Sequence, residues 1–209
     1  MNDQMSKEPS LDSTDVEIIE RKTLFQAYFR IDRYRVRHRL FAGGWSGEVV
    51  REVFERGHAA AVMPYDPRRD LVLLVEQFRV GALSAGRRPW VLEVPAGIIE
   101  ADETAEEVAR REVVEEAGVA VDTLELMYEF LATPGGSSET CALYCGRADL
   151  GKAGGIFGLP EEHEDIRVLV MPADAALKLM ADGRVENATA IVALQWLALN
   201  RDRLRRDWS

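Results

Sequence analysis

Hydrophobic and polar residues alternate along residues 16–22, 29–40 and 47–55 with the two-residue period of β-strands. A glycine-rich turn at residues 42–44 separates the second segment from the third. The second segment carries four arginines on one side: Arg33, Arg35, Arg37 and Arg39. Arginines in such a row usually form a solvent-facing edge that discourages aggregation. The pattern predicts a small antiparallel β domain at residues 13–56.

From residue 57 onward the hydrophobic runs are longer and are interrupted by turn residues. Strands are predicted in these runs at residues 59–65, 71–78, 90–97, 124–131, 141–147 and 166–171. Helical spacing of apolar residues predicts helices at residues 105–117, 173–181 and 189–205. This order of elements predicts a mixed sheet flanked by helices, an α/β sandwich, in a second domain at residues 57–209.

The helix predicted at residues 105–117 has signals at both ends and a cluster of carboxylates on one face. Thr104 and Glu107 have the spacing of a capping box, and Gly118 lies where a left-handed C-cap residue belongs. Three glutamates recur at helical spacing: Glu112, Glu115 and Glu116. Side chains three and four residues apart share a helix face, so these carboxylates are expected to converge.

Two interpretations of this carboxylate face are open: a solvated charged surface or a metal site. An ordinary ion pair is expected between Glu107 and Arg111, which are one turn apart, and Arg111 can also reach Glu115. Glu112 and Glu116 are one turn from each other, and a like-charged pair at that spacing costs about 0.2–0.5 kcal/mol. A divalent cation would reverse that cost, and hard oxygen ligands suit magnesium or manganese. The pattern favours the metal site.

Composition and charge narrow the classes of partner. The chain has 209 residues and a formal net charge of −10, which argues against general binding to the nucleic-acid backbone. No apolar run approaches membrane-spanning length, and residues 1–12 are expected to form a flexible polar tail without a signal core. Cys141 and Cys145 fall on one side of a predicted strand, where reduced, buried thiols are favoured. We expect a cytoplasmic protein with no membrane or nucleic-acid partner.

Residues 97–119 fit the pattern G-x5-E-x7-R-E-U-x-E-E-x-G-U, in which U is a bulky aliphatic residue. The chain therefore resembles the Nudix hydrolases. The resemblance extends to the segments FERGHAAAVMPYDP and PWVLEVPAG, and to Pro134, which lies 15 residues after Val119 as in the ADP-ribose pyrophosphatase branch of that family. It implies the family's α/β/α sandwich with a mixed sheet, and hydrolysis of ADP-ribose to AMP and ribose 5-phosphate.

The same resemblance implies a metal site and a general base. The expected metal ligands are the carbonyl of Ala96 and the carboxylates of Glu112, Glu116 and Glu164. They would hold two or more Mg²⁺ ions, with Mn²⁺ as an alternative. Glu162 resembles the general base, with Glu115 as a support or a second candidate. By their chemistry alone, Glu161 and His163 stay open as bases, and a solvated acidic loop is the other interpretation of residues 161–165.

Substrate contacts and assembly are also implied by the resemblance. The expected substrate-binding residues are Tyr28, Phe29, Arg51, Glu52, Arg79, Ile98, Thr133, Pro134, Gly135 and Glu139. The aromatic pair would lie near adenine, and arginines suit a diphosphate because of their fork geometry. The family branch implies a homodimer that exchanges its N-terminal domain and shares its sites between chains. The alternatives are another nucleoside diphosphate sugar, such as GDP-mannose or UDP-glucose, and a non-catalytic ligand sensor of the same fold.

Overall fold

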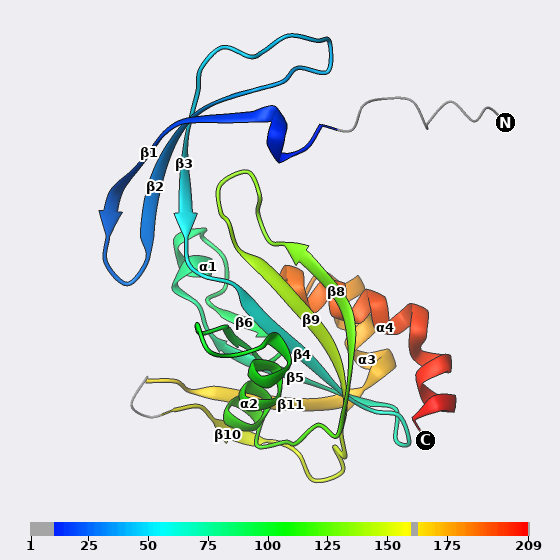
Figure 1. Ribbon diagram of the computed structural model, residues 1–209. Coiled ribbons are helices and arrows are strands. Elements are labelled where there is room, and N and C mark those ends of the chain that lie inside the picture. The colour runs from blue at the N-terminus through cyan, green and yellow to red at the C-terminus, as the bar shows by residue number, and fades with distance from the viewer. Residues whose placement is uncertain (1–10, 160–162, 209) are drawn as a thin grey trace, which may run out of the picture. The chain divides into compact units, whose positions relative to one another are not determined.

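The structure is a computed structural model, and its described part comprises residues 11–159 and 163–208. The chain divides into two compact units (Figure 1). The first unit contains residues 1–56 and 132–139, and the second contains residues 57–131 and 140–209. That the chain forms two independent domains divided between residues 56 and 57 stays a prediction. Sequence patterns did not assign the loop at residues 132–139 to the first unit.

The first unit is built on a three-stranded antiparallel sheet in the order β1-β2-β3. A short 3-10 helix, η1 (Ser13–Asp15), precedes β1 (Val16–Gln26), which pairs with β2 (Arg30–His38). The third strand is β3 (Val49–Glu55). The predicted strands are present, although β1 continues four residues beyond the predicted end at residue 22. All eleven residues of β1 are exposed, so its hydrophobic side chains face solvent in the single chain.

The arginines of β2 were predicted to lie on an edge strand, which was wrong, because β2 is the central strand of the sheet. They form a ladder of cross-strand ion pairs on its exposed side. The pairs are Arg33 with Glu52, Arg35 with Glu48 and Glu20, and Arg37 with Glu17. These side chains are partly exposed, so solvent screening keeps the contribution of each pair to stability small. The ladder favours the register of the three strands because opposite charges lie on neighbouring strands.

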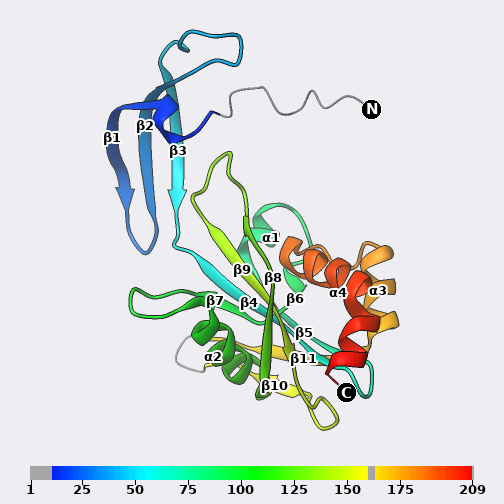
Figure 2. The same ribbon diagram turned by 45° about the vertical axis from the view of Figure 1, so that its right-hand side comes forward.

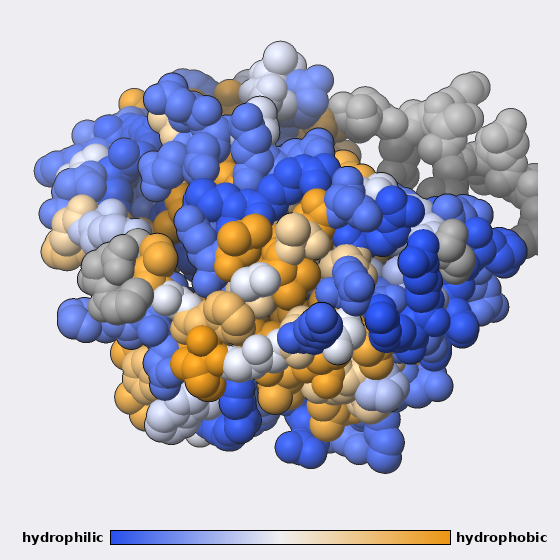
Figure 3. Space-filling model, turned by 90° about the horizontal axis from the view of Figure 1, so that it is seen from below, coloured by the Kyte–Doolittle hydropathy of each residue, from blue (hydrophilic) through white to orange (hydrophobic). Residues whose placement is uncertain are grey.

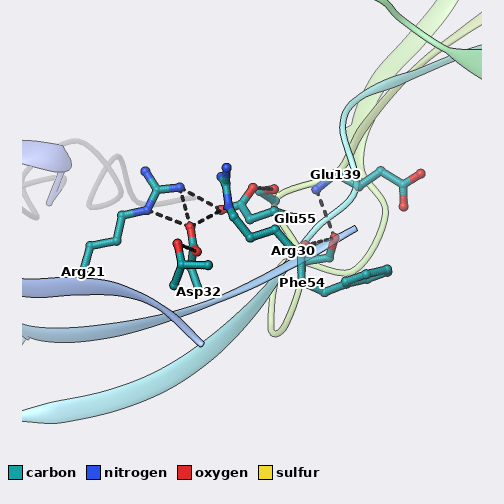
Figure 4. Close-up of polar contacts among 9 residues, drawn as sticks. Arg21, Arg30, Asp32, Phe54, Glu55 and Glu139 are labelled. Carbon is teal, nitrogen blue, oxygen red and sulfur yellow. Dashed lines mark hydrogen bonds and ion pairs between the residues drawn. The ribbon is translucent and has the colours of Figure 1, made fainter. Parts of the chain in front are cut away.

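A buried carboxylate connects the strands of the first unit. Asp32 of β2 is 1% exposed and accepts hydrogen bonds from Arg21 Nη2 at 2.7 Å and Thr23 Oγ1 at 2.8 Å (Figure 4). Arg30 Nε donates to the same carboxylate at 3.0 Å, and Arg21 also contacts Glu55 of β3. Burial raises the pKa of Asp32, but hydrogen bonds from Thr23 and Arg21 bring it below its ordinary value. The buried charge is therefore compensated from β1 and from its own strand.

The loop at residues 132–139 is attached to β3 by hydrogen bonds. The backbone amide of Phe54 donates to the carbonyl of Gly136 at 2.8 Å, and Ser137 Oγ donates to the carbonyl of Phe54 at 2.9 Å. Arg56 and Glu139 lie 3.5 Å apart as an ion pair. Figure 4 shows Phe54 and Glu139 on their two segments. These contacts explain why a loop distant in sequence belongs to the first unit.

The second unit contains an eight-stranded sheet whose main path runs β10-β11-β5-β4-β9-β8, with β6 paired to β5 and β7 paired to β4. The pairing of β4 with β9 is parallel and the other pairings are antiparallel, so the sheet is mixed, as predicted. The strands are β4 (Ala59–Asp66), β5 (Leu71–Phe78), β6 (Trp90–Glu93), β7 (Ala96–Ile98), β8 (Thr123–Leu131), β9 (Thr140–Arg147), β10 (Gly155–Phe157) and β11 (Ile166–Pro172).

Helices cover both faces of this sheet. One face packs against α2 (Ala105–Ala117), and the other packs against α3 (Ala173–Ala181) and α4 (Ala188–Asp207) (Figure 2). Strand β5 divides its side chains accordingly: Val75 lies in the core on the α2 side, and Leu74 lies in the core on the α3 and α4 side. The second unit is therefore the expected α/β/α sandwich.

Two details differ from the sequence prediction. The run at residues 90–97 forms two strands, β6 and β7, because Pro95 has no backbone N–H to continue the ladder. The carbonyl of Pro95 instead accepts from Val62 N at 2.9 Å. The short helix α1 (Val80–Ser84) and strand β10 were not predicted, since each is too short to show a hydrophobic period.

The surface carries hydrophobic residues among many hydrophilic ones. Figure 3 shows one face on which hydrophobic side chains gather between hydrophilic groups. Individual exposed hydrophobic residues include Val114, which is 51% exposed, and Ile156, which is 64% exposed. Scattered residues of this kind are ordinary on protein surfaces. Within the described ranges, no helix has the length and apolar character needed to span a membrane.

Candidate active site

Helix α2 is fixed in position by its predicted caps. Thr104 Oγ1 accepts from Glu107 N at 3.3 Å, and the carboxylate of Glu107 accepts from Thr104 N at 2.8 Å, so the capping box is present. Gly118 ends the helix with a left-handed backbone at φ 63°. Val108 and Val113 are fully buried against the sheet. The caps and this buried stripe together set which way the glutamates point.

The glutamates of α2 lie against strand β7. Glu116 is only 3% exposed, and its Oε2 accepts a hydrogen bond from Ala96 N at 3.2 Å. Glu112 occupies the space beside Gly97, where an added Cβ would lie 1.7 Å from Glu112 Oε1. Only glycine at residue 97 permits this approach of strand and carboxylate. The structure therefore brings together Glu112, Glu116 and the backbone of Ala96, whose amide, and not the predicted carbonyl ligand, contacts Glu116.

The electrostatics of this carboxylate pair are unfavourable without a cation. Burial and the charge of Glu112 raise the pKa of Glu116 to about 8, and the charge of Glu164 acts in the same direction. The hydrogen bond from Ala96 and the charge of Arg79 oppose this increase but do not cancel it. Burial also raises the pKa of Glu112. A site that retains a proton on a buried carboxylate near neutral pH can exchange that proton for a metal cation.

The donor atoms fit a hard divalent cation, although the ligand set is incomplete in the described part of the chain. Among residues 11–159 and 163–208, no three His, Cys, Asp or Glu side chains are gathered as a metal site. Glu164 affects Glu116 through its charge, while its Oε2 accepts from Leu159 N at 3.3 Å. The predicted base Glu162 and its alternative Glu161 lie outside the described residues. A buried carboxylate, Glu116, and a partly buried one, Glu112, nevertheless supply the oxygen chemistry that Mg²⁺ or Mn²⁺ prefers.

Arg111 organises the acidic end of this site: its expected contact with Glu115 is present, whereas the expected ion pair with Glu107 is not. Its guanidinium donates to Glu112 at 2.6 Å and to Glu115 and Glu103 at 2.9 Å. Glu107, the predicted partner, instead binds Thr104 in the capping box. Sequence spacing could not show this because Glu103 precedes the helix and folds back on it. Glu115 is therefore held by an arginine that also contacts the glutamate pair.

Arg79 is held close to the same carboxylates by a buried partner. Its Nη2 donates to Glu93 Oε2 at 2.9 Å, and Glu93 is 7% exposed. Burial lowers the pKa of Arg79, but the bond to Glu93 and the charges of Glu116 and Glu164 raise it further, so the guanidinium stays charged. The backbone amide of Arg79 also donates to the carbonyl of Pro89 at 2.7 Å, which closes the segment between them into a loop.

Sequence reasoning missed two polar side chains on this face. They are Glu93, which holds Arg79, and Gln77. Glu93 pairs with Val75 across β5 and β6, and Gln77 is two residues after Val75, so both side chains lie on the same face of the sheet as Val75. Gln77 is 5% exposed, and its Nε2 has no hydrogen-bond partner among the residues described here. The sequence could have indicated Gln77, because it is a polar residue within the hydrophobic run of β5. The signal for Glu93 was a carboxylate in a strand otherwise expected to be buried.

The remaining predicted substrate residues belong mostly to the first unit. Tyr28 is 83% exposed and packs edge-on against Phe29, with ring centroids 4.7 Å apart. Phe29 contacts Phe54 in the same way at 5.1 Å, and the Arg56 guanidinium lies 5.7 Å from the Phe29 ring centroid. This unit therefore presents an aromatic cluster with an adjacent cation.

Other predicted contacts are distributed over both units. In β3, Arg51 Nη1 donates to the carbonyl of Val50 at 2.7 Å, and Glu52 pairs with Arg33. The loop of the first unit carries four further predicted residues: Thr133, Pro134, Gly135 and Glu139. Ile98 lies in β7 of the second unit and directly follows Gly97, the residue that Glu112 approaches. The assignment of all these residues to substrate stays a prediction.

The second unit is a three-layer α/β sandwich that carries a carboxylate-rich site on α2. Residues 55–193 match the family described as NUDIX domain. The chain belongs to the NUDIX family. The resemblance predicted from the sequence is confirmed.

Curated relatives extend this similarity over nearly the whole chain. ADP-ribose pyrophosphatase of Escherichia coli (strain K12) is 49% identical over 93% of this chain and 93% of that protein. ADP-ribose pyrophosphatase of Haemophilus influenzae is 43% identical over 98% of this chain and 96% of that protein. GDP-mannose pyrophosphatase of Cronobacter sakazakii is 34% identical over 90% of this chain and 97% of that protein. A solved ADP compounds hydrolase superposes with a TM-score of 0.69 over 94% of this chain and 98% of that one, and its 19% identity supports the fold alone.

Replacing Gly97 by alanine tests the close approach of β7 to Glu112. The new Cβ would displace the Glu112 carboxylate, so Gly97→Ala is expected to weaken Mn²⁺ binding by about tenfold to a hundredfold. Titration calorimetry with Mn²⁺ measures the change, and thermal unfolding checks the fold. Gly47→Ala is the matched control, because a Cβ at Gly47 meets no atom within 4 Å. Equal Mn²⁺ affinity in both variants would contradict the assignment of Glu112.

The pKa of Glu116 predicts how the stability of the metal-free protein depends on pH. Its value is about 8 in the folded chain and about 4.3 in an unfolded chain, so between these values the folded chain binds the extra proton. The free energy of unfolding should therefore fall as pH rises from 5 to 8 in EDTA, by at most about 1.4 kcal/mol per pH unit from this group. Urea unfolding at several pH values measures it.

Two variants isolate the contribution of Glu116. Glu116→Gln cannot titrate, so its free energy of unfolding should change less steeply with pH than that of the parent chain. Glu129→Gln changes an exposed glutamate of β8 in the same way and should keep the parent slope. If the Glu116→Gln slope equals the parent slope, the raised pKa is wrong.

Proposed function

We propose that this protein hydrolyses the diphosphate bond of ADP-ribose to AMP and ribose 5-phosphate. The observation that carries the proposal is the pair of buried Glu116 and partly buried Glu112 on α2, with Arg79 in its electrostatic field. Carboxylates that need a cation, beside an arginine that can grip phosphate oxygens, suit a metal-assisted attack on a diphosphate. The curated relatives at 49% and 43% identity carry the name ADP-ribose pyrophosphatase, which supports this substrate and a hydrolase activity.

The proposed metal ligands are the carbonyl of Ala96 and the carboxylates of Glu112, Glu116 and Glu164. They would hold two or more Mg²⁺ ions, with Mn²⁺ as the alternative. Such ions neutralise the charge of a diphosphate and acidify a bound water. The raised pKa values of Glu112 and Glu116 support a cation at this place, because a cation removes the repulsion between the two carboxylates.

The side chains of the protein perform the remaining steps. Glu162 is proposed to accept the proton of the attacking water, with Glu115 as the second candidate. Arg111 holds Glu115 and Glu112 in place through its ion pairs. Arg79 donates to phosphate oxygens, and its bond to Glu93 fixes the orientation of the guanidinium. The charge that develops on the leaving phosphate is thereby met by a positioned donor.

The first unit is proposed to supply the substrate contacts distant from the metal. The aromatic rings of Tyr28 and Phe29 would lie near adenine, because exposed rings can stack on a base. The other proposed contacts are Arg51, Glu52, Ile98, Thr133, Pro134, Gly135 and Glu139. The exposed hydrophobic residues of β1, including Ile18 at 61% and Phe25 at 58%, support a homodimer in which this unit is covered and shared between chains.

A reducing compartment such as the cytoplasm is the proposed location. Cys141 and Cys145 lie in the same strand, β9, and are 5% and 0% exposed. Burial raises the pKa of Cys145 well above its ordinary value, so its thiol is protonated and inert. Buried, unreactive cysteines of this kind are typical of proteins in reducing surroundings.

A second candidate is hydrolysis of GDP-mannose by the same residues. The similarity to GDP-mannose pyrophosphatase of Cronobacter sakazakii, at 34% identity, favours this candidate over other nucleotide sugars. The carboxylate site would be the same in both reactions. The two candidates differ only in the nucleoside and the sugar that the chain selects.

Product analysis distinguishes these reactions. Purified protein with Mg²⁺ is given ADP-ribose, GDP-mannose, UDP-glucose, NADH or diadenosine polyphosphates, and products are separated by ion-exchange chromatography. We expect AMP and ribose 5-phosphate from ADP-ribose at the highest kcat/KM, and no turnover in EDTA or with Glu112→Gln. Faster turnover of GDP-mannose would overturn the substrate, whereas binding without turnover of any compound would indicate a sensor.

The general base is tested by separating chemistry from binding. Glu162→Gln is expected to lower kcat for ADP-ribose by about a hundredfold or more, because general-base catalysis contributes about 10²–10⁴-fold. The dissociation constant for ADP-ribose, measured in Ca²⁺ without turnover, should change little. Glu115→Gln, Glu161→Gln and His163→Asn are the matched variants. Retained kcat in Glu162→Gln with loss in one of these would reassign the base to that residue.

A further inference from the structure

A second charged cleft lies in the second unit, away from the glutamate pair. Its volume is about 500 Å³, which is within the range of small-molecule sites. Six charged residues line it: Glu76, Arg87, Arg88, Arg167, Arg184 and Glu186. Their chemistry resembles neither the hydrophobic cores nor the acidic site on α2.

The sheet separates this cleft from the candidate active site. Glu76 follows Leu74 by two residues in β5, so its side chain shares the face of Leu74, which packs against α3 and α4. Leu92 of β6 lies in the same core and also lines the cleft. Glu112 and Glu116 belong to α2 on the opposite face (Figure 2). A ligand in the cleft would therefore bind independently of the α2 carboxylates.

A buried glutamate positions two of the arginines. Glu76 is 6% exposed and forms ion pairs with Arg88, at 2.7 Å, and with Arg167. The side chains of Arg88 and Arg167 are 64% and 55% exposed, so each uses part of its donors internally and presents the rest to solvent. Holding the guanidinium groups in place in advance reduces the ordering cost of binding an anion.

The charges of the cleft do not balance. Arg87 pairs with Glu186, and Glu76 is shared between two arginines. Arg184 forms no ion pair with any residue in the described ranges, so its donors are available. Four guanidinium groups therefore face two carboxylates, a surplus of two positive charges in a chain whose formal net charge is −10. A local positive surplus of this kind attracts an anionic ligand.

The donors and the neighbouring aromatic ring indicate the class of ligand. Guanidinium forks match the paired oxygens of a phosphate group. Trp90 lines the cleft with half of its surface exposed and offers a ring face to a sugar or a base. We propose that this cleft is a binding site for a phosphate monoester of nucleotide or sugar-phosphate size. The proposal is independent of the reaction assigned to the site on α2.

Titration calorimetry in EDTA, where the metal-dependent reaction is off, tests the proposal. Inorganic phosphate, ribose 5-phosphate and AMP are titrated separately into the full chain. Arg184→Glu reverses one charge without breaking an internal ion pair and is expected to weaken binding about tenfold or more. Arg206→Glu is the matched control, since it makes the same charge change near the C-terminal end of α4. That position is about 25 Å along the helix from the N-terminal end, which follows Arg184 in the chain. The control should bind within about twofold of the parent chain.

The outcomes separate this cleft from the candidate active site. Loss of affinity in Arg184→Glu, with retention in Arg206→Glu and Arg79→Ala, supports the proposal. The ligand bound most tightly then shows whether phosphate, sugar or base is read. Absence of binding by all three ligands, or binding that is unchanged in Arg184→Glu and lost in Arg79→Ala, overturns it. Equal thermal unfolding of the variants confirms that the changes are local.

Discussion

The second unit depends on placing two like-charged carboxylates in a nearly dry space. Glu116 is 3% exposed and lies beside Glu112, while β7 approaches both because residue 97 is glycine. Burying a charge without a partner is among the largest penalties in a protein interior. The hydrogen bond from Ala96 and the field of Arg79 at Glu116, and the ion pair of Arg111 with Glu112, reduce that penalty, yet the pKa values of both glutamates stay raised. The surrounding residues therefore leave part of the electrostatic penalty of the two carboxylates uncompensated, and a cation is the simplest species that removes it.

Strand alternation explains how one sheet supports two different electrostatic environments. In β5, Glu76 faces the arginine-lined cleft, and Gln77 faces the side of α2. In β6, Leu92 lies in the core with α3 and α4, whereas Glu93 holds Arg79. Consecutive residues of β5 and β6 thus face the two regions in turn, although the acidic site's carboxylates come from α2 and the cleft's arginines from loops and β11. The physical separation is one layer of backbone, and no additional domain is needed to keep opposite charges apart.

Local signals determined how well the sequence predicted the structure. The caps at Thr104 and Gly118 and the apolar stripe between them are local, so the position of α2 could be predicted closely. The partner of Arg111 could not, because Glu103 returns from outside the helix. Nor could the pairing of Arg79 with Glu93, since it depends on β6 lying beside β5. Helical spacing placed Glu112 and Glu116 on one face, but their burial depends on β7, which is distant in sequence.

The hydrogen bond from Arg79 N to Pro89 O has a consequence for how this protein could be altered. The two residues close a loop, residues 80–88, that leaves the sheet after β5 and returns to it at β6. The length of such a loop can change while its two ends stay fixed, because loop closure costs rise only slowly with length. Its first part, residues 80–85, does not line the arginine cleft and is accordingly a natural insertion point for a peptide tag or a fluorescent reporter. An insert there would leave the strands that carry Arg79 and Glu93 in register.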